Sequence, residues 1–253
     1  MNNSRDTIEH LTEFALSMGE IMLVSGAEMA RVEDTVCRIL KAGGLTSPEV
    51  FALPTGIFVG ARDRRGIAAM HRVTDRSTNL FRICRLNQLS REFCSKKKTL
   101  KEAEEELLRI KSDPDYGFLI KLLGYALCCG FFAVMFGGGA AEVLAAAGVG
   151  LLLCAVLKFL SRYSLSDFIR VMMGAFTVGL STLLVQHFLW TPLMADAVLI
   201  GAIMPLVPGA TLTTGIRDTI NGDYSAGTAR IAEAVVTALA VATGVAGSMM
   251  VLR

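Results

Sequence analysis

Charged residues are scarce in the second part of this chain. Only 7 of its 25 lysines and arginines, and 6 of its 23 aspartates and glutamates, lie after residue 116. Because charged residues make up roughly a quarter of a typical soluble domain, this scarcity excludes an ordinary soluble protein. With 53% hydrophobic residues overall, the composition indicates a membrane protein. Both parts are nearly neutral, which argues against a broad basic surface for nucleic acid.

Residues that serve catalysis or bind metals are also few. His10 and His71 are the only histidines before residue 117, and no cluster of His, Cys and Glu has the spacing of a metal site. The sequence lacks a G-x-S-x-G elbow and a phosphate-binding G-x-x-x-x-G-K-[ST] loop. Its six cysteines form no C-x-x-C pair, so we interpret them as reduced packing residues. We therefore expect neither an enzyme nor a bound cofactor or metal.

A small α+β domain in the cytoplasm is predicted for residues 1–116. The first residues, MNNSRDTIEHLTEF, carry acids and lack the apolar core and cleavage site of a secretory signal. Apolar residues then recur at spacings of three and four, which places them on one face of each of four amphipathic helices. These apolar residues are Ile8, Leu11, Ala15, Met18 and Met22; Met29, Val32, Val36 and Ile39; Leu80, Ile83, Leu86 and Phe93; and Leu100, Ala103, Leu107 and Ile110.

Local signals predict where the elements of this domain begin and end. Ser25 with Glu28 fits a capping box for the second helix, and Gly43-Gly44 marks its end. The stretch VFALPTGIFVGARDRRGIAAMHRV is rich in β-branched and aromatic residues around a turn-like RDRRG. We predict two or three strands here, including a hairpin at Asp63 to Gly66.

Five long apolar stretches follow from Gly117 onward. Each is near the roughly 20 residues that a helix needs to cross about 30 Å of hydrocarbon. The predicted outer loops contain no Lys or Arg, whereas the predicted inner loops contain several, as the positive-inside rule requires for a cytoplasmic N-terminus. We therefore predict an α-helical integral membrane domain of five spans over residues 117–253. The spans are expected at residues 117–137, 140–157, 168–189, 193–212 and 231–251.

The number and composition of these spans suggest a partner. An odd number of spans without an internal repeat is unusual for a complete secondary transporter. Small residues at close spacing in GGGAAEVLAAAGVG and ALAVATGVAGS allow helices to pack backbone to backbone in lipid. Such packing takes place either within this chain or against a second membrane subunit, and the sequence leaves both open.

Two prolines interrupt the fourth predicted span at its cytoplasmic end. Pro205 and Pro208 have no amide hydrogen, so the carbonyls of Gly201 and Met204 lose their usual helical partners. Breaks of this kind are tolerated in membranes mainly where protein or a water-filled cavity surrounds them. If a helix resumes near Ala210, its first amides carry partial positive charge and can hold a carboxylate.

Polar residues after the break suit a substrate site. Arg217 can pair with a carboxylate through two hydrogen bonds, and Asp218 or Asp223 can balance Arg217 or Arg230. Glu233 follows Arg230 by three residues inside the last span, where an ionisable residue is usually paired or handles a proton. The alternative is a capped inner loop that follows the positive-inside rule. The predicted substrate-binding or gating residues are Pro205, Pro208, Gly209, Thr211, Thr214, Arg217, Asp218, Asp223, Arg230 and Glu233.

Three other ionisable residues of the membrane domain lie nearer the ends of their spans. These are Lys121, Glu142 and Asp196. Because side chains at span ends can reach the interface, we interpret these three as structural.

Three segments resemble the threonine/serine exporter family of bacterial inner-membrane carriers. They are SGAEMARVEDTVCRIL, FALPTGIFVGARD and PLVPGATLTTGIRDTINGDYSAGTARIAEA, and the resemblance extends over about residues 10 to 250. In this family, fused members carry ten spans, whereas split members pair a chain like this one with a second, smaller membrane protein. The resemblance implies export of small metabolites, either threonine and serine or dicarboxylates such as succinate. It also implies that an ion gradient, and not ATP, drives export.

Two further interpretations of the chain stay open. One is a membrane scaffold or sensor subunit without transport, although anchors need no prolines and paired charges at a span end. The other is a membrane-attached hydrolase, for which the catalytic residues are sparse. The segment GAEMARVED, with Glu28, Arg31, Glu33 and Asp34, is interpreted as a charge-paired helix face that contacts the inner mouth of the membrane domain.

Overall fold

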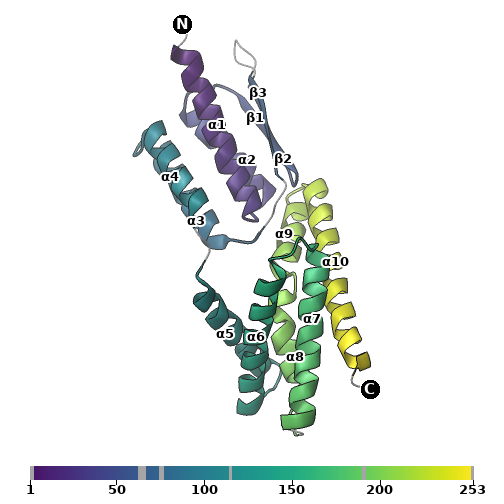
Figure 1. Cartoon of the computed structure of the whole chain (residues 1–253). Coiled ribbons are helices and arrows are strands. Elements are labelled where there is room, and N and C mark those ends of the chain that lie inside the picture. The colour runs from purple at the N-terminus through teal and green to yellow at the C-terminus, as the bar shows by residue number, and fades with distance from the viewer. Residues whose placement is uncertain (1–2, 62–66, 74–76, 114–115, 190–191, 252–253) are drawn as a thin grey trace. The chain divides into compact units, whose positions relative to one another are not determined.

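The computed structural model describes residues 3–61, 67–73, 77–113, 116–189 and 192–251 and divides the chain into two compact units (Figure 1). Unit 1 consists of Met1–Asp113 together with Ala210–Ile231. Unit 2 consists of Pro114–Gly209 together with Ala232–Arg253. A segment from late in the sequence therefore belongs to the same unit as the N-terminal region.

Unit 1 contains the four predicted amphipathic helices. They are α1 (Asn3–Val24), α2 (Met29–Ala42), α3 (Leu80–Cys94) and α4 (Leu100–Ser112). Most residues of the predicted apolar stripes are buried in one shared core, which confirms the helical periodicity. Leu80 is an exception, since it lies at the first position of α3 and is 71% exposed.

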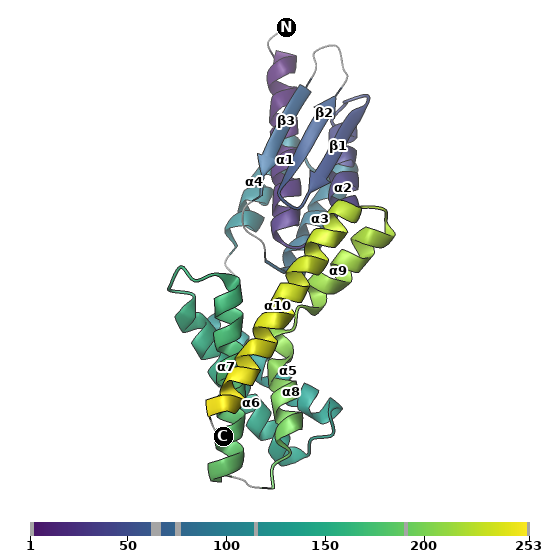
Figure 2. The ribbon, with the colours of Figure 1, turned by 90° about the vertical axis from the view of Figure 1, so that its right-hand side faces the viewer.

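A three-stranded antiparallel sheet completes the core of unit 1. The strands β1 (Pro48–Leu53), β2 (Gly56–Ala61) and β3 (Ile67–Arg72) pair in the order β1-β2-β3. The prediction of strands here is confirmed, while the hairpin predicted at Asp63 to Gly66 lies outside the described residues. Helices α1 and α2 pack against the sheet on one side (Figure 2).

The other side of the sheet exposes large apolar residues. Phe51 pairs with Phe58, and Phe58 pairs with Met70, so the three side chains form one row across the strands. They are 57%, 41% and 60% exposed. Strands with one covered face usually place polar residues on the other face, so this row departs from the usual pattern.

The start of α2 differs from the predicted capping box. The residue at the N-cap is Glu28 and not Ser25, and its side chain forms no cap hydrogen bond. The hydroxyl of Ser25 is buried without a hydrogen-bond partner in the described structure. The local signal was therefore wrong about the cap, whereas the end of the helix at Gly43 agrees with the prediction.

The late segment of unit 1 forms a helical hairpin. Helix α9 (Gly209–Ile220) is followed by α10 (Tyr224–Val251), whose residues up to Ile231 belong to this unit. A Cβ atom at Gly227 would lie 2.1 Å from Thr219 Oγ1 and 2.9 Å from the carbonyl oxygen of Gly215. Only a glycine therefore permits the close approach of α10 to α9 at this position.

Unit 2 consists of apolar helices. They are α5 (Phe118–Met135), α6 (Ala140–Leu160), α7 (Asp167–Leu184) with the π-helical turn η1 (Val185–Leu189), α8 (Ala195–Ile203) with the 3-10 turn η2 (Met204–Leu206), and the rest of α10. Four helices of the described chain are long and apolar enough to cross a membrane, and α8-η2 with α9 makes a fifth if the broken pair is one span. A mainly helical protein with several spans is confirmed.

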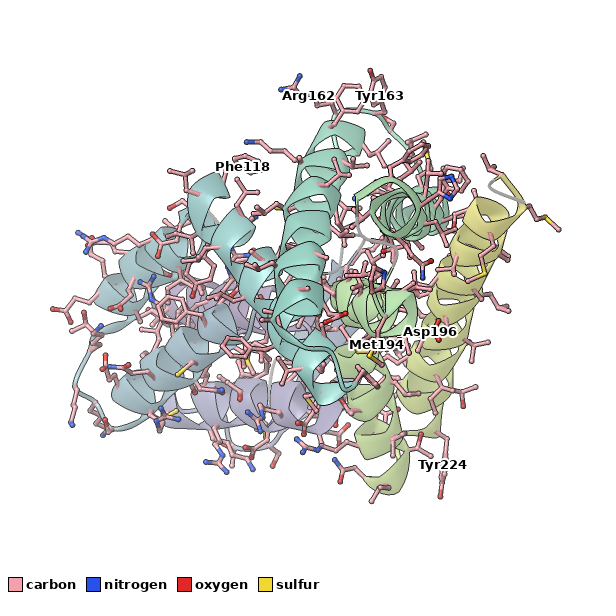
Figure 3. All side chains as sticks on the ribbon, turned by 90° about the horizontal axis from the view of Figure 1, so that it is seen from below. Phe118, Arg162, Tyr163, Met194, Asp196 and Tyr224 are labelled. Atoms are coloured by element: carbon pink, nitrogen blue, oxygen red, sulfur yellow. The ribbon has the colours of Figure 1, made fainter. Side chains whose placement is uncertain are left out.

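Two polar contacts of unit 2 lie near the ends of its helices. The carboxylate of Glu142 is buried and accepts hydrogen bonds from the amides of Gly139, at 2.8 Å, and Met194, at 3.1 Å. It therefore caps both α6 and α8, because Met194, which is labelled in Figure 3, is the N-cap residue of α8. Near the start of α5, the ammonium of Lys158 lies 3.6 Å from the centroid of the Phe118 ring.

Small residues allow close packing of the apolar helices. A Cβ atom at Gly201 of α8 would lie 2.7 Å from the amide nitrogen of Ala133 and 2.9 Å from the carbonyl oxygen of Cys129, both on α5. These are backbone atoms, which cannot rotate away as a side chain can. Helices α5 and α8 thus meet backbone to backbone, the arrangement that small residues favour in membranes.

Replacing Gly201 by alanine should separate α5 from α8 and lower the free energy of unfolding by about 1–3 kcal/mol, the usual effect of overpacking. The measurement is reversible unfolding of the purified protein in detergent. Gly148→Ala is the matched control, because nothing lies within 4 Å of a Cβ atom there. Equal stability of the two variants would contradict this account of the contact.

Candidate functional site

The predicted helix break is present and has a defined backbone geometry. Helix α8 ends at Ile203, η2 covers Met204–Leu206, and Val207 has extended φ and ψ angles of −68° and 129°. The carbonyl of Met204, which loses its helical partner at Pro208, accepts a hydrogen bond from the amide of Val207 at 3.2 Å. A 3-10 hydrogen bond therefore replaces one of the helical bonds that the prolines remove.

The hydroxyls after the break contact the backbone of α9. Thr213 and Thr214 both donate hydrogen bonds to the carbonyl of Ala210, at 3.0 and 2.8 Å. Thr211 is partly buried in the same turn. These hydrogen bonds fix the threonine side chains on the first turns of α9 and leave their oxygens as acceptors.

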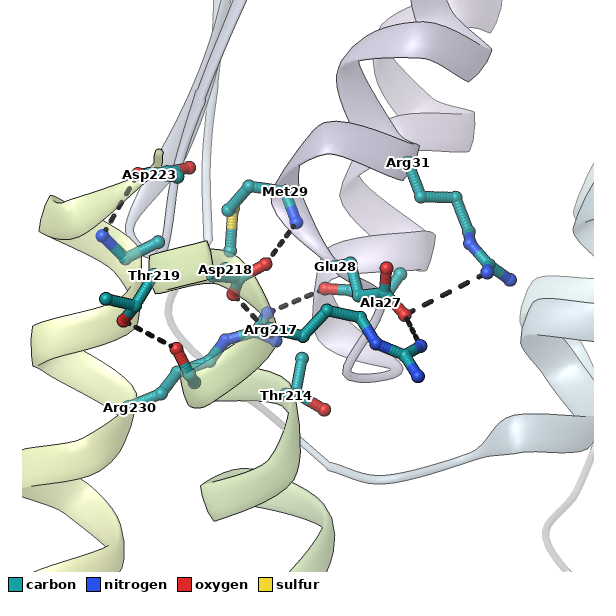
Figure 4. Close-up of polar contacts among 12 residues, drawn as sticks. Ala27, Glu28, Met29, Arg31, Thr214, Arg217, Asp218, Thr219, Asp223 and Arg230 are labelled. Atoms are coloured by element: carbon teal, nitrogen blue, oxygen red, sulfur yellow. Dashed lines mark hydrogen bonds and ion pairs between the residues drawn. The ribbon is translucent and has the colours of Figure 1, made fainter. Parts of the chain in front are cut away.

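Asp218 is the centre of a buried polar cluster in unit 1. Its side chain is completely buried, and its Oδ1 accepts a hydrogen bond from the amide of Met29 at 3.2 Å. Its Oδ2 lies 3.3 Å from Nη1 of Arg230 (Figure 4). Asp218 thus caps α2 from a distant part of the chain, at the helix end where the side chain of Glu28 forms no cap.

Arg230 joins this cluster from α10. Its side chain is only 8% exposed, and its Nη2 donates a hydrogen bond of 2.6 Å to the carbonyl of Ala27. The same guanidinium therefore contacts the carboxylate of Asp218 and the backbone just before α2. A buried charge needs such partners, because water cannot solvate it.

Arg217 forms a second, more exposed ion pair. Its Nη1 contacts Oε1 of Glu28, and the same oxygen lies 3.9 Å from Nη2 of Arg31. The Arg217 side chain is 63% exposed, whereas that of Glu28 is 18% exposed. Figure 4 shows Glu28, at the start of α2, beside Arg217 of α9. One carboxylate is thus shared by two guanidinium groups.

Asp223 acts locally at the start of α10. Its Oδ1 accepts a hydrogen bond from the amide of Ala226 at 3.2 Å, which caps the helix. Its charge also acts on Glu33 of α2. Burial raises the pKa of Glu33, and the negative charge of Asp223 raises it further, while a hydrogen bond from the Ala52 amide lowers it.

The structure brings together only some of the predicted site residues. Arg217, Asp218 and Arg230 contact the α1–α2 corner of unit 1, which we define as Ala27, Glu28 and Met29. Thr211, Thr214 and Asp223 belong to the same unit, in which the side chains of Thr214 and Asp223 form hydrogen bonds to the backbones of α9 and α10. The remaining predicted residues, Pro205, Pro208, Gly209 and the exposed Glu233, belong to unit 2.

The corner was only partly visible in the sequence. Glu28 is one of the charges of GAEMARVED, which we expected to form a charge-paired helix face in contact with the inner mouth of the membrane domain. Ala27 and Met29 take part through their backbone atoms, so side-chain chemistry gives no signal for them. The available signal was the absence of a good N-cap residue at the start of α2.

Comparison with known proteins agrees with the motif resemblance. A family model for threonine/serine exporters matches residues 13–252. The "Threonine/serine exporter" of Corynebacterium glutamicum is 26% identical over 241 residues, which cover 91% of this chain and 49% of that protein. The "Probable succinate transporter subunit YjjP" of Klebsiella aerogenes is 25% identical over 242 residues, 94% of this chain and 93% of that protein.

The two relatives differ in length. This chain spans about half the length of the Corynebacterium protein but nearly all of the Klebsiella protein. No solved structure matches the chain.

Asp218→Ala should destabilise unit 1 strongly. The substitution leaves the Arg230 charge buried without its carboxylate and removes the cap of α2, and breaking a buried pair typically costs about 3–5 kcal/mol. Hydrogen exchange of the α2 amides should therefore accelerate, together with a lower free energy of unfolding.

The control is Asp34→Ala, which breaks the exposed Asp34–Arg38 pair on the same helix. Exposed pairs contribute about 0–1 kcal/mol, so this variant should remain close to wild type. Equal protection of α2 in both variants would show that Asp218 is not its cap.

Proposed function

The chain belongs to the threonine/serine exporter family, and we propose that it is one subunit of a secondary-active exporter of small carboxylate-bearing metabolites. The family is one of transporters and not of enzymes, and the protein is a multi-pass membrane protein. We place it in the bacterial inner membrane, with residues 1–116 as the cytoplasmic domain and residues 117–253 as five spans. The fourth span, expected at residues 193–212, then comprises α8, η2 and the first residues of α9.

The distribution of basic residues supports this orientation. With the N-terminus in the cytoplasm, Lys158, Arg162 and Arg170 fall in one inner loop, and Arg217 and Arg230 fall in the next. Cytoplasmic loops of membrane proteins carry such an excess of Lys and Arg. The helix break then lies at the cytoplasmic end of the fourth span, where a substrate enters for export.

The lengths of the relatives support a second membrane subunit. The chain matches about half of one relative, and the other relative is named as a transporter subunit and is covered almost completely. A single half with five spans fits a protein that completes its transport path with a partner. Exposed apolar residues on the predicted spans, such as Leu119, Leu144 and Leu239, provide surface for lipid and for that partner.

The chemistry shared by the candidate substrates points to Arg217. Threonine, serine and succinate all carry a carboxylate, the group that a guanidinium binds best. Arg217 is already paired with a carboxylate, that of Glu28, and the arginine side of this pair is exposed. We propose that an incoming substrate carboxylate replaces Glu28 at Arg217, since exposed pairs are weak enough to exchange.

Asp218 and Arg230 have a different part in this proposal. Both are buried and both bind the α1–α2 corner, so they hold the α9–α10 hairpin in place while Arg217 exchanges its partner. Glu233 lies one helical turn after Arg230, and we assign it to proton coupling because the family implies an ion gradient. The observation that carries the proposal is therefore the ion pair between Arg217, which is exposed, and Glu28. This pair follows the helix break in the sequence and lies next to the buried pair of Asp218 and Arg230.

Arg217→Ala and Glu233→Gln should each abolish export while leaving the amount of membrane protein unchanged. The measurement is efflux of threonine, serine and succinate from vesicles that contain this chain and its partner, under a proton gradient. Arg162→Ala, an exposed basic residue of another predicted inner loop, is the control and should transport normally. Normal efflux from both test variants would refute this placement, and no transport by the wild-type pair would favour a scaffold or sensor.

Glu28→Gln should have the opposite effect on substrate affinity. The substitution removes the carboxylate that competes for Arg217, so the KM of a carboxylate substrate should fall by up to about fivefold, corresponding to an exposed pair of at most about 1 kcal/mol. The measurement is the dependence of efflux on internal substrate concentration. A KM that rises instead would show that Glu28 assists substrate binding.

A further inference from the structure

A second polar feature of unit 1 lies away from the α1–α2 corner, in a groove between α2 and α3. The cavity has a volume of about 260 Å³ and is lined by four residues of each helix. On α2 the lining residues occupy positions i, i+3, i+4 and i+7 from Arg31, and on α3 they occupy the same spacing from Asn87. This spacing places each set on one helical face, so the two faces line a polar groove at the surface between the helices.

The groove carries an excess of positive charge. Its lining includes Arg31, Arg38 and Arg91 but only one carboxylate, that of Asp34. Asp34 accepts a hydrogen bond of 2.8 Å from Nε of Arg38, which neutralises one arginine. Arg91 forms no ion pair with any residue that the structure describes. Arg31 lies 3.9 Å from the carboxylate of Glu28, which does not line the groove. Among the lining arginines, Arg91 therefore presents the unneutralised charge.

Neutral hydrogen-bonding groups form the floor of the groove. The side chains of Thr35 and Ser90 are buried, each with 6% exposure, and both line the cavity. Burial raises the pKa of the Cys94 thiol, so this group is also neutral at pH 7. The hydroxyl of Ser90 forms a hydrogen bond with the Cys94 thiol. The floor therefore adds neutral hydroxyl groups without adding negative charge.

The size and charge of the groove select the class of ligand. One water occupies about 30 Å³ in the liquid, so the cavity equals roughly eight or nine waters, the size of a small metabolite. Arg91 lies on one wall, whereas Arg31 and Arg38 lie on the other, so positive charge faces the ligand from two sides. A dicarboxylate, with a charge at each end, matches this arrangement better than a compact anion.

We propose that the groove between α2 and α3 is a binding site for a small dicarboxylate. Arg91 binds one carboxylate, Arg31 with Arg38 binds the other, and the hydroxyls of Thr35 and Ser90 complete the site. The site lies wholly within unit 1 and shares none of the predicted transport residues. It does not rest on the proposed export, because binding is measured without transport.

The test is titration calorimetry of the purified full-length chain in detergent with succinate as the probe. We expect saturable binding that dimethyl succinate does not reproduce, because the ester has no charge, and that weakens as salt is added. Arg91→Gln should weaken binding by about tenfold or more, the usual loss for a charged hydrogen-bonded pair. Arg91→Lys, which keeps the charge, should restore part of the affinity.

Two controls separate the groove from other basic surfaces. Arg109→Gln removes the same charge from an exposed position of α4 outside the groove and should bind succinate as wild type does. Arg217→Ala leaves Glu28 to Arg31 alone, so it should weaken succinate binding by no more than about fivefold even if it abolishes export. This change is smaller than the loss expected for Arg91→Gln, so failure of one proposal does not decide the other. Circular dichroism of each variant verifies that the helices are intact.

Three results would overturn the proposal. The first is absence of succinate binding to the wild-type chain, and the second is equal affinity of the wild type and Arg91→Gln. The third is tighter binding of inorganic phosphate than of succinate, which would identify a compact anion as the ligand.

Discussion

No side chain of the preceding loop caps helix α2, and the arrangement of unit 1 depends on which group supplies the missing hydrogen-bond acceptor. The first amides of any helix have no partner within it. At α2 the side chain of Glu28 does not turn back to the helix, and the acceptor is instead Asp218, 189 residues later in the sequence. Because a carboxylate cannot be buried alone, Arg230 accompanies it and binds the carbonyl of Ala27 as well. The need of the Met29 amide for a hydrogen-bond acceptor thus brings the start of α2 together with α9 and α10.

The same requirement separates the charged residues of the hairpin into two classes. Asp218 and Arg230 are buried, and removing one of them leaves the other charge uncompensated in a poorly solvated place. Arg217 is mostly exposed, and water solvates it when its partner leaves. A residue that exchanges partners during transport must belong to the second class, since each exchange of a buried ion pair would cost several kcal/mol. Burial therefore singles out Arg217 among three charges that look equivalent in the sequence.

Features that depend on local sequence were predictable, and features that depend on distant contacts were not. The apolar stripes gave the four helices of the N-terminal region, and the missing amide hydrogens of Pro205 and Pro208 gave the break after α8. The Ser25 capping box was wrong because the motif describes residues that are near in sequence, whereas the acceptor here comes from α9. The sequence pattern also did not predict that residues 210–231 belong to the same unit as the N-terminal region. Its charges satisfied the positive-inside rule equally well, so nothing in the pattern required a partner on α2.

Arg31 gives the groove and the α1–α2 corner a physical connection. Its guanidinium lines the groove and also lies 3.9 Å from the Glu28 oxygen that contacts Arg217. An anion that binds Arg31 competes with Glu28 for it, and Glu28 then has only Arg217 as a cationic partner. The Arg217–Glu28 pair is strengthened in consequence, which makes Arg217 harder for a substrate carboxylate to capture. Because Arg31 is 47% exposed, the coupling amounts to at most about 1 kcal/mol, or roughly fivefold in affinity. By linkage the effect is reciprocal, so a substrate that occupies Arg217 frees Glu28 for Arg31 and weakens the anion in the groove by the same factor.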